Sequence, residues 1–204
     1  MADPLMPGNG IVNFCPAPGN WSVNQCQARG RRRRLGRAPG RRGSGYLGLV
    51  TTAIAQFMRE LERVWDEHRD ALLLRRDLSA ALARLAAEPS VLHIPAMTGA
   101  AGRAACERFF AEDLLPHLPG DLVLARMSRT VDRFRLVDET RVSFTHDREL
   151  PWLLPGISPT YRRAEVLAVA IISFERGRIR SQRILWDHAT LTAQLGIPGL
   201  VAPG

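Results

Sequence analysis

The chain has 204 residues and a formal net charge of +8, and all 28 of its basic residues are arginines. The absence of lysine excludes Schiff-base chemistry and a lysine general base. Residues 1–48 carry eight arginines and one acid, a net charge of +7, whereas residues 49–204 carry twenty arginines and nineteen acids, a net charge of +1. The folded part is therefore nearly neutral, and a nucleic-acid partner is not expected for it.

Residues 1–48 are rich in Gly, Pro and Arg and show no apolar periodicity. We therefore expect a disordered tail over 1–48 and one folded domain over 49–204. Three interpretations of the tail stay open. It could be leader sequence translated from an upstream start codon, or a solvated tail without a specific role. It could also be an arm whose run from Arg31 to Arg34 binds phosphate or another anionic surface.

Several classes of protein lack support in the sequence. The three cysteines, Cys15, Cys26 and Cys106, have neither metal-site spacing nor the even number of a disulfide framework. The five histidines form no HExxH motif. No apolar stretch approaches the roughly 18 residues of a membrane span, and the N-terminus lacks the order of a secretory signal. We expect a cytoplasmic protein without a membrane span, a metal site or a cofactor.

The first half of the domain has helical patterning. From about residue 51, apolar residues recur with helical spacing and acidic and basic residues fill the other face, which predicts an amphipathic helix that runs on to Leu74. Leu78, Leu82 and Leu85 predict a second helix over about 77–87 that stops before Pro89. A short strand over 91–93, a loop over 95–99 and a third helix over 100–114, with Ala105, Phe109 and Phe110 on its buried side, follow.

The second half is rich in strand patterns, at about 121–131, 133–146, 162–175 and 178–187. The residues from Glu175 to Arg178 predict a tight hairpin turn between the last two strands. Three prolines and a glycine make 147–161 a long loop, and a short helix near 188–195 closes the domain. Helices followed by antiparallel strands predict an α+β fold with the helices on one face of a curved sheet.

Several stretches carry a resemblance to a known family. They are His93 to Gly99, Val137-Asp138-Glu139, Ser143 to His146, Leu150 to Gly156, and Trp186-Asp187 followed by Gln194-Leu195-Gly196. With the order of elements, they resemble the SnoaL-like polyketide cyclases of the nuclear transport factor 2-like superfamily over about 55–197. The resemblance implies a cone of mainly antiparallel sheet with three N-terminal helices packed in its mouth, in a bacterial protein that forms a homodimer.

One departure from that family bears on the chemistry. SnoaL-like cyclases place an acid/base aspartate on the strand before the last hairpin, and Ala170 stands at that position in our alignment. A catalytic acid must therefore come from elsewhere in this chain.

Four residues are candidates for that chemistry. His146 follows the apolar face of its strand to the proline-rich loop and could transfer a proton near neutral pH, or could simply bond to a loop carbonyl. Glu165 lies beside an apolar run, either as an acid or base with a raised pKa or as the salt-bridge partner of Arg141, Arg162 or Arg163. Asp187 ends the last strand and could replace the missing acid or cap the next helix. His93, before Pro95, is catalytic or structural.

Four large side chains are candidates for substrate binding. Trp152 lies in the proline-rich loop, where it could act as a lid over the mouth of the cone. Met97, Phe144 and Trp186 are core residues or ligand contacts.

Together these features predict a small-molecule enzyme without a cofactor. Its apolar pocket would isomerise, cyclise or hydrolyse a hydrophobic carbonyl compound or epoxide. His146, with Asp187 or Glu165, would move the proton, and His93 or a backbone amide would polarise an oxygen. The alternative is a non-catalytic ligand-binding or dimerisation module, because this fold hosts both kinds of protein.

Overall fold

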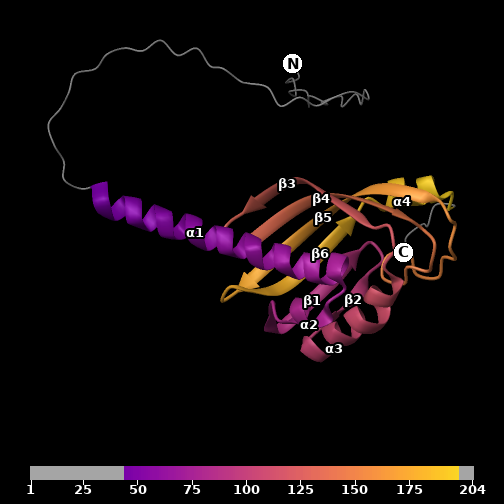
Figure 1. Ribbon diagram of the computed structural model, residues 1–204, viewed down its shortest axis with the longest axis horizontal. Helices are drawn as coiled ribbons and strands as arrows, with labels where there is room; N and C mark the ends of the chain where they lie inside the picture. The colour runs from indigo at the N-terminus through magenta and orange to yellow at the C-terminus, as the bar shows by residue number, and fades with distance from the viewer. Residues whose placement is uncertain (1–43, 198–204) are drawn as a thin grey trace, which may run out of the picture. The chain divides into compact units, whose positions relative to one another are not determined.

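The structure, a computed structural model, describes residues 44–197, and the side chains from residue 52 onward. The helices are α1 (Ser44–Arg69), α2 (Leu78–Leu82), α3 (Arg103–Arg108) and α4 (His188–Leu195), with π-helical turns η1 (Asp70–Arg75) and η2 (Phe109–Leu114) and a 3-10 turn η3 (Leu115–His117). The strands are β1 (Leu85–Ile94), β2 (Thr98–Ala101), β3 (Val123–Val131), β4 (Arg135–Thr145), β5 (Arg163–Glu175) and β6 (Arg178–Trp186) (Figure 1).

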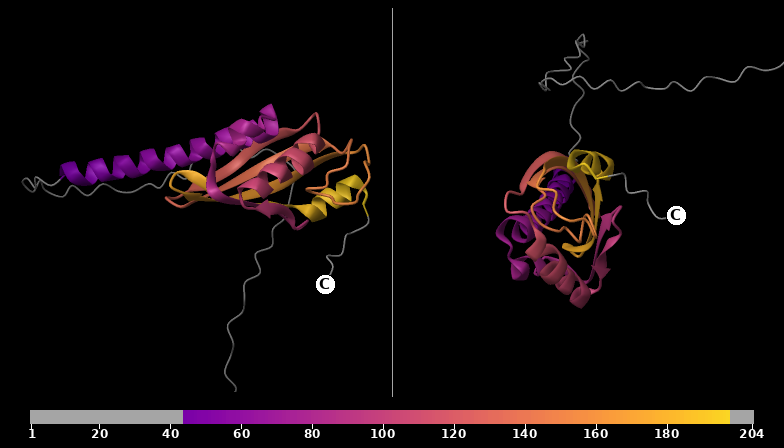
Figure 2. Two further views of the ribbon diagram at one scale, coloured as in Figure 1. Left: turned by 90° about the horizontal axis from the view of Figure 1, so that it is seen from below. Right: turned by 90° about the vertical axis from the view of Figure 1, so that its right-hand side faces the viewer.

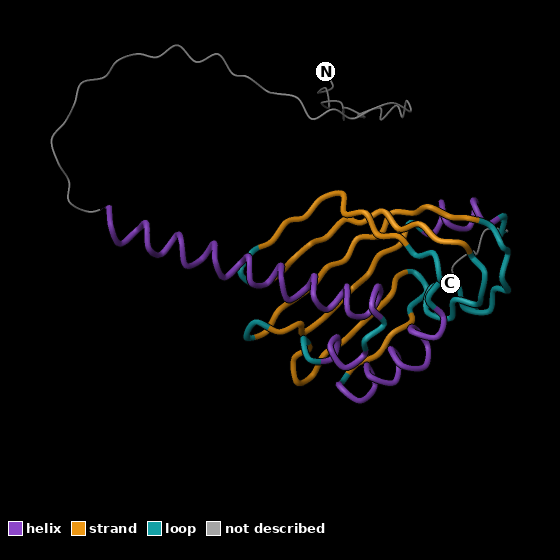
Figure 3. Tube along the Cα trace, viewed as in Figure 1, coloured by secondary structure: helices purple, strands orange, loops and turns teal. Residues whose placement is uncertain are grey.

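The six strands form one sheet in the order β2-β1-β6-β5-β4-β3 (Figure 3). Every neighbouring pair is antiparallel except β1 and β6, which run parallel. The sheet curls around the C-terminal part of α1 without closing into a barrel (Figure 2). The α+β fold with a curved, mainly antiparallel sheet is therefore confirmed.

Strand alternation determines which side chains meet inside the curl. From Leu136 to Val142 on β4, the buried residues are Leu136, Asp138, Thr140 and Val142, whereas the residues between them are more exposed. Helix α1 buries Leu61, Val64 and Trp65 against this face, and its described side chains before Leu61 are exposed or half-buried. The concave face of the sheet and the end of α1 thus share one core.

The start of the domain differs from the predicted boundary. Helix α1 begins at Ser44, inside the range 1–48 that we assigned to the tail. Residues 1–43, including the run from Arg31 to Arg34, lie outside the described residues, so the three interpretations of the tail stay predictions.

The predicted second helix is too long. Helix α2 ends at Leu82, and strand β1 begins at Leu85, where the prediction still had helix. Leu85 is buried as the partner of Ile179 on β6, so its apolar character serves a strand. The register of β1 with β6 shifts between Leu85 and Ser90, and this irregularity accommodates Pro89, which has no N–H for the ladder. The predicted strand over 91–93 is the end of this longer strand.

The predicted loop over 95–99 and the third helix also need correction. Residues 98–101 form β2, which pairs with β1, so the helix begins at Arg103 rather than at residue 100. Gly99 makes this pairing possible, because a Cβ there would lie 2.1 Å from the carbonyl oxygen of Val91. Phe109 and Phe110 are buried as predicted, in η2 rather than in a continuous α-helix.

The second half agrees with the prediction within about three residues at every strand end. The tight turn after β5 is confirmed, with positive φ at Arg176 (50°) and Gly177 (74°), the conformation of a two-residue hairpin. Helix α4 spans His188–Leu195, as predicted.

None of the described helices combines the length and the apolar character that a bilayer crossing requires.

Candidate active site

The concave face of the sheet, the end of α1 and the η2 turn enclose a cavity of about 80 Å³. Its walls are mostly apolar, with leucines from η1 and from the segment before β3, Phe110 from η2 and Val91 from β1. The polar side chains that line it are Trp65, His68, Arg69, His93, Asp138, Thr140, Trp152, Gln182 and Trp186. An apolar cavity with a few polar groups is the usual form of a small-molecule site.

One row of cross-strand neighbours crosses the floor of this cavity. Asp138 on β4 is opposite Ala170 on β5, Ala170 is opposite Ile184 on β6, and Ile184 is opposite His93 on β1. All four line the cavity. Strands lie about 4.8 Å apart, so about 14 Å of sheet separates the backbones of Asp138 and His93. The curl directs both side chains toward the same space.

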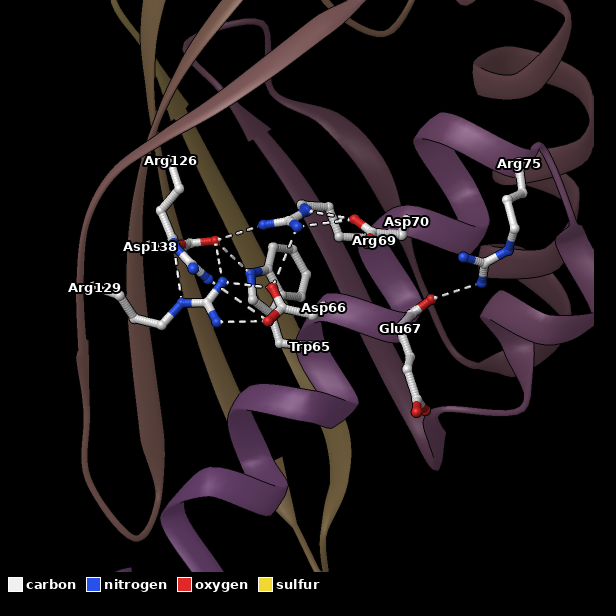
Figure 4. A network of polar contacts seen from close by, with 9 residues as sticks. All are labelled: Trp65, Asp66, Glu67, Arg69, Asp70, Arg75, Arg126, Arg129 and Asp138. Atoms are coloured by element: carbon white, nitrogen blue, oxygen red, sulfur yellow. Dashed lines mark hydrogen bonds and ion pairs between the residues drawn. The ribbon is translucent and has the colours of Figure 1, made fainter.

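Asp138 is the only carboxylate among the described residues that line the cavity, and its side chain is 1% exposed. Its Oδ2 accepts from the indole N–H of Trp65 at 2.8 Å, from Arg129 at 2.8 Å and from Arg69 at 3.3 Å. Its Oδ1 accepts from Arg129 Nε at 3.0 Å (Figure 4). A carboxylate has about four acceptor positions, two on each oxygen, so Oδ1 retains room for another donor.

The two arginines connect Asp138 to the helix side of the cavity. Arg129 also bonds both oxygens of Asp66 on α1, at 3.0 and 2.7 Å, and Arg69 bonds Asp70 at 2.8 Å. Burial acts to raise the pKa of Asp66, but the hydrogen bonds and charge of Arg129 outweigh it and lower that pKa. Burial acts to lower the pKa of Arg129, which is 7% exposed, but the hydrogen bonds and charges of Asp66 and Asp138 together outweigh it and raise that pKa. Each carboxylate of this network is paired with at least one arginine.

His93 lies at the other end of the row. The indole N–H of Trp186 donates to His93 Nδ1 at 3.2 Å, so Nδ1 carries no proton. Burial lowers the pKa of His93 to about 4, and the ring is therefore neutral at pH 7, with its proton on Nε2. No partner for Nε2 occurs among residues 52–197. His93 can thus donate a hydrogen bond to a ligand oxygen without carrying a charge.

His68 lines the same cavity and has a structural role there. Its Nδ1 contacts the carbonyl oxygen of Ala81 at 2.9 Å, which fixes the proton on Nδ1, and its Nε2 accepts from the amide of Gln182 at 3.0 Å. The ring is completely buried and stacks on Trp65 at 5.9 Å. Burial lowers the pKa of His68, so it stays neutral and both nitrogens are occupied.

The structure brings three of the eight predicted site residues to the cavity: His93, Trp152 and Trp186. Trp152 is 3% exposed, so it is part of the wall rather than a solvent-exposed lid. Phe144 is buried in the core outside the lining, and Met97 is 67% exposed and does not line the cavity.

His146 is completely buried outside the lining of the cavity. Its Nδ1 accepts from the backbone N–H of Thr160 at 3.3 Å, so it joins the two ends of the proline-rich loop. The bond goes to a loop N–H rather than to a loop carbonyl, which differs from the structural alternative that we considered. Burial lowers the pKa of His146, although the charge of Asp147 opposes this.

The two predicted carboxylates also lie away from the cavity. Glu165 projects from the outer face of β5, where it is 56% exposed and pairs with Arg141 at 3.4 Å. Asp187 caps α4, since its side chain accepts from the backbone N–H of Thr190 at 3.1 Å, and its contacts with Thr190 lower its pKa. For both residues the contact is the structural alternative that the sequence left open.

Asp138 is the cavity carboxylate that the prediction missed. It lies directly opposite Ala170, where the family resemblance expects an aspartate. A carboxylate is therefore present in the same cross-strand row, one strand away. Strand alternation could have identified it, since the face shared by Thr140 and Val142 includes Asp138 two residues earlier.

Among the described residues, no group of three His, Cys, Asp or Glu could hold a metal ion.

A curled, unclosed six-stranded sheet around a helix-covered apolar cavity defines the nuclear transport factor 2-like class of folds, and comparisons with solved structures confirm that class. A SnoaL-like polyketide cyclase from Jannaschia sp. CCS1 is 16% identical, with 71% of this chain and 94% of that one covered and a TM-score of 0.55. A polyketide cyclase from Acidithiobacillus ferrooxidans is 14% identical, with 67% and 94% covered and a TM-score of 0.56.

A nuclear transport factor 2-like protein of unknown function from Burkholderia pseudomallei is 20% identical, with 67% of this chain and 97% of that one covered and a TM-score of 0.52. Identities this low show a shared fold and carry no function across. No protein-family model matches the chain, and no curated protein matches it.

Proposed function

We propose that the protein is a small-molecule enzyme that performs acid/base chemistry on a hydrophobic carbonyl compound or epoxide. The observation that supports this most is the carboxylate of Asp138 in a mostly apolar cavity, in the same cross-strand row as the neutral imidazole of His93. A donor and an acceptor facing one apolar space are the groups that isomerisation, cyclisation or hydrolysis requires.

The two ends of the row have different roles in this proposal. His93 Nε2–H donates to the substrate oxygen and stabilises the negative charge that develops there. Asp138 Oδ1 has room for one more donor, so it accepts a substrate proton or orients a water molecule. Four hydrogen bonds fix the Asp138 carboxylate in place, so it acts through its position. The proton transfer that we expected of His146 with Asp187 or Glu165 is assigned to Asp138 instead, because those side chains lie outside the cavity.

Filling the cavity tests whether it is the binding site. Ala170 is 8% exposed and lies between Asp138 and Ile184 on the floor, so Ala170→Leu adds three carbon atoms to a space of about 80 Å³. We expect any ligand found by thermal-shift screening of small ketones and epoxides to bind at least about tenfold more weakly to this variant. The control is Val169→Leu on the outer face, which should bind like the wild type.

Equal affinity of Ala170→Leu and the wild type would exclude the cavity as the site. Ligands that bind there but are not converted, as followed by NMR over hours, would favour the alternative function, a non-catalytic ligand-binding module. That alternative has its own support, because four hydrogen bonds already hold Asp138.

A homodimer is also part of this proposal. Val137, Leu167 and Leu185 on the outer face of the sheet are 38%, 38% and 37% exposed, and the apolar Val169 and Ile171 lie among them. Exposed apolar patches of this kind mark contact surfaces, and a second copy of the same sheet would be complementary in its apolar character.

Leu167→Arg tests the homodimer, because it replaces an apolar residue of this outer face with a second arginine directly opposite Arg141. We expect the wild type to sediment as a dimer and Leu167→Arg as a monomer in analytical ultracentrifugation at about 50 μM. A monomeric wild type at that concentration, or a dimeric Leu167→Arg, would contradict this part of the proposal.

A further inference from the structure

One indole at the wall of the cavity has an unused hydrogen-bond donor. Three tryptophans line the cavity. Trp65 donates to Asp138 and Trp186 donates to His93, but the Nε1 of Trp152 is buried with no partner among the described residues. A buried donor without a partner costs roughly 1–3 kcal/mol, so such groups are rare without a reason.

The fold holds this donor beside a second one. Thr98 on β2 is the register partner of His93 on β1, and its hydroxyl donates to the carbonyl oxygen of Trp152 at 2.6 Å. The ring centroids of Trp152 and His93 are 5.4 Å apart and meet edge to face, at 62°. Thr98 therefore acts as a positioning residue that brings the free indole N–H next to the imidazole whose Nε2–H is also free.

Among the ring nitrogens of His93, Trp152 and Trp186, two are free donors and none is a free acceptor. The Nδ1 of His93 is the one acceptor of the ring cluster, and it is occupied by the indole N–H of Trp186. A hydroxyl group placed here would leave its own proton without an acceptor, whereas a carbonyl oxygen has two lone pairs and no proton. Such an oxygen also projects in the plane of its molecule, where two N–H groups can reach both lone pairs.

We propose that Trp152 and His93 together form an oxygen-binding site that selects a planar ketone, or the enolate derived from it, over alcohols and hydrocarbons. The inference rests on the proposed function, because it specifies the substrate class of the same cavity. The rings of Trp152 and Trp186, tilted at 55° with centroids 5.6 Å apart, form an aromatic wall against which a planar ring beside the oxygen can pack. The developing charge of an enolate would be stabilised by the same two donors.

The experiment uses the full chain with three matched probes: 1-indanone, 1-indanol and indane. In ¹⁵N-labelled wild-type protein, 1-indanone should move the indole N–H resonance of Trp152 downfield, and indane should not. The indole resonance of Trp65, which already donates to Asp138, should stay in place with either compound. The wild type should bind 1-indanone about tenfold or more tightly than the other two probes.

Trp152→Phe keeps an aromatic ring and removes the donor. We expect it to weaken 1-indanone binding about tenfold and to change indane binding by less than about twofold. Ile184→Val is the matched control, since it loosens the same wall without removing a donor and should weaken both probes alike. The wild-type resonance shift decides the question even where Trp152→Phe fails to fold.

Two results would overturn the inference. If the wild type binds all three probes equally and the Trp152 resonance does not move, the oxygen-binding site is wrong while the cavity remains a binding site. If none of the probes binds and Ala170→Leu behaves as the wild type in the wider ligand screen, the proposed function fails together with the inference.

Discussion

Asp138→Asn is expected to lower the free energy of unfolding by about 3–5 kcal/mol, because it removes the charge that compensates Arg129 and Arg69 in a buried site. The Asp138 and Arg129 side chains are 1% and 7% exposed, so water cannot replace the lost partner. The asparagine would also direct an N–H group at one of the donors that the carboxylate now accepts. Urea-induced equilibrium unfolding at pH 7 measures the change.

Glu165→Gln is the matched control for that measurement. It also removes a carboxylate that pairs with an arginine, but Glu165 and Arg141 are 56% and 49% exposed, so the loss should be at most about 1 kcal/mol. If Asp138→Asn destabilises the protein no more than Glu165→Gln does, the buried network is not a stabilising connection between α1 and the sheet.

Acidification below neutral pH is expected to destabilise the protein before its carboxylates titrate. The folded state lowers the pKa of His93 to about 4 by burial, and the unfolded chain has an ordinary histidine pKa of about 6.5. The unfolded state therefore binds more protons between these two values. The contribution of a neutral His93 is fully present above pH 6.5 and is lost as the pH falls through 4.

For His93 alone this loss amounts to about 3 kcal/mol, since each pKa unit corresponds to about 1.4 kcal/mol. Burial also lowers the pKa of His68 and His146, so both act in the same direction. Urea unfolding at pH 7, 5.5 and 4.5 measures the combined slope. His93→Gln should flatten it, whereas Ile184→Val, a change at the neighbouring position of the same row, should lower stability equally at each pH. An identical slope in His93→Gln would contradict the assignment of a neutral buried His93.

Strand alternation and turn residues predicted the second half of the chain because those signals are local. The hairpin of β5 and β6 needs positive φ at Arg176 and Gly177, and the Glu-Arg-Gly-Arg sequence permits it without help from the rest of the fold. The buried face of β4 follows from its sequence in the same way. The contacts of Asp187 and Glu165 with Thr190 and Arg141 were among the alternatives that the residues themselves suggested.

The sequence by itself thus determined the fold class and the four strands of the second half, because period-two alternation and turn chemistry act over a few residues. Only the tertiary structure decided that Leu85 belongs to a strand, because the partner that buries it, Ile179, is far away in sequence. It also decided which polar groups share the cavity. Asp138, Ala170, Ile184 and His93 come from four strands, and their row exists only once the register of all four is set.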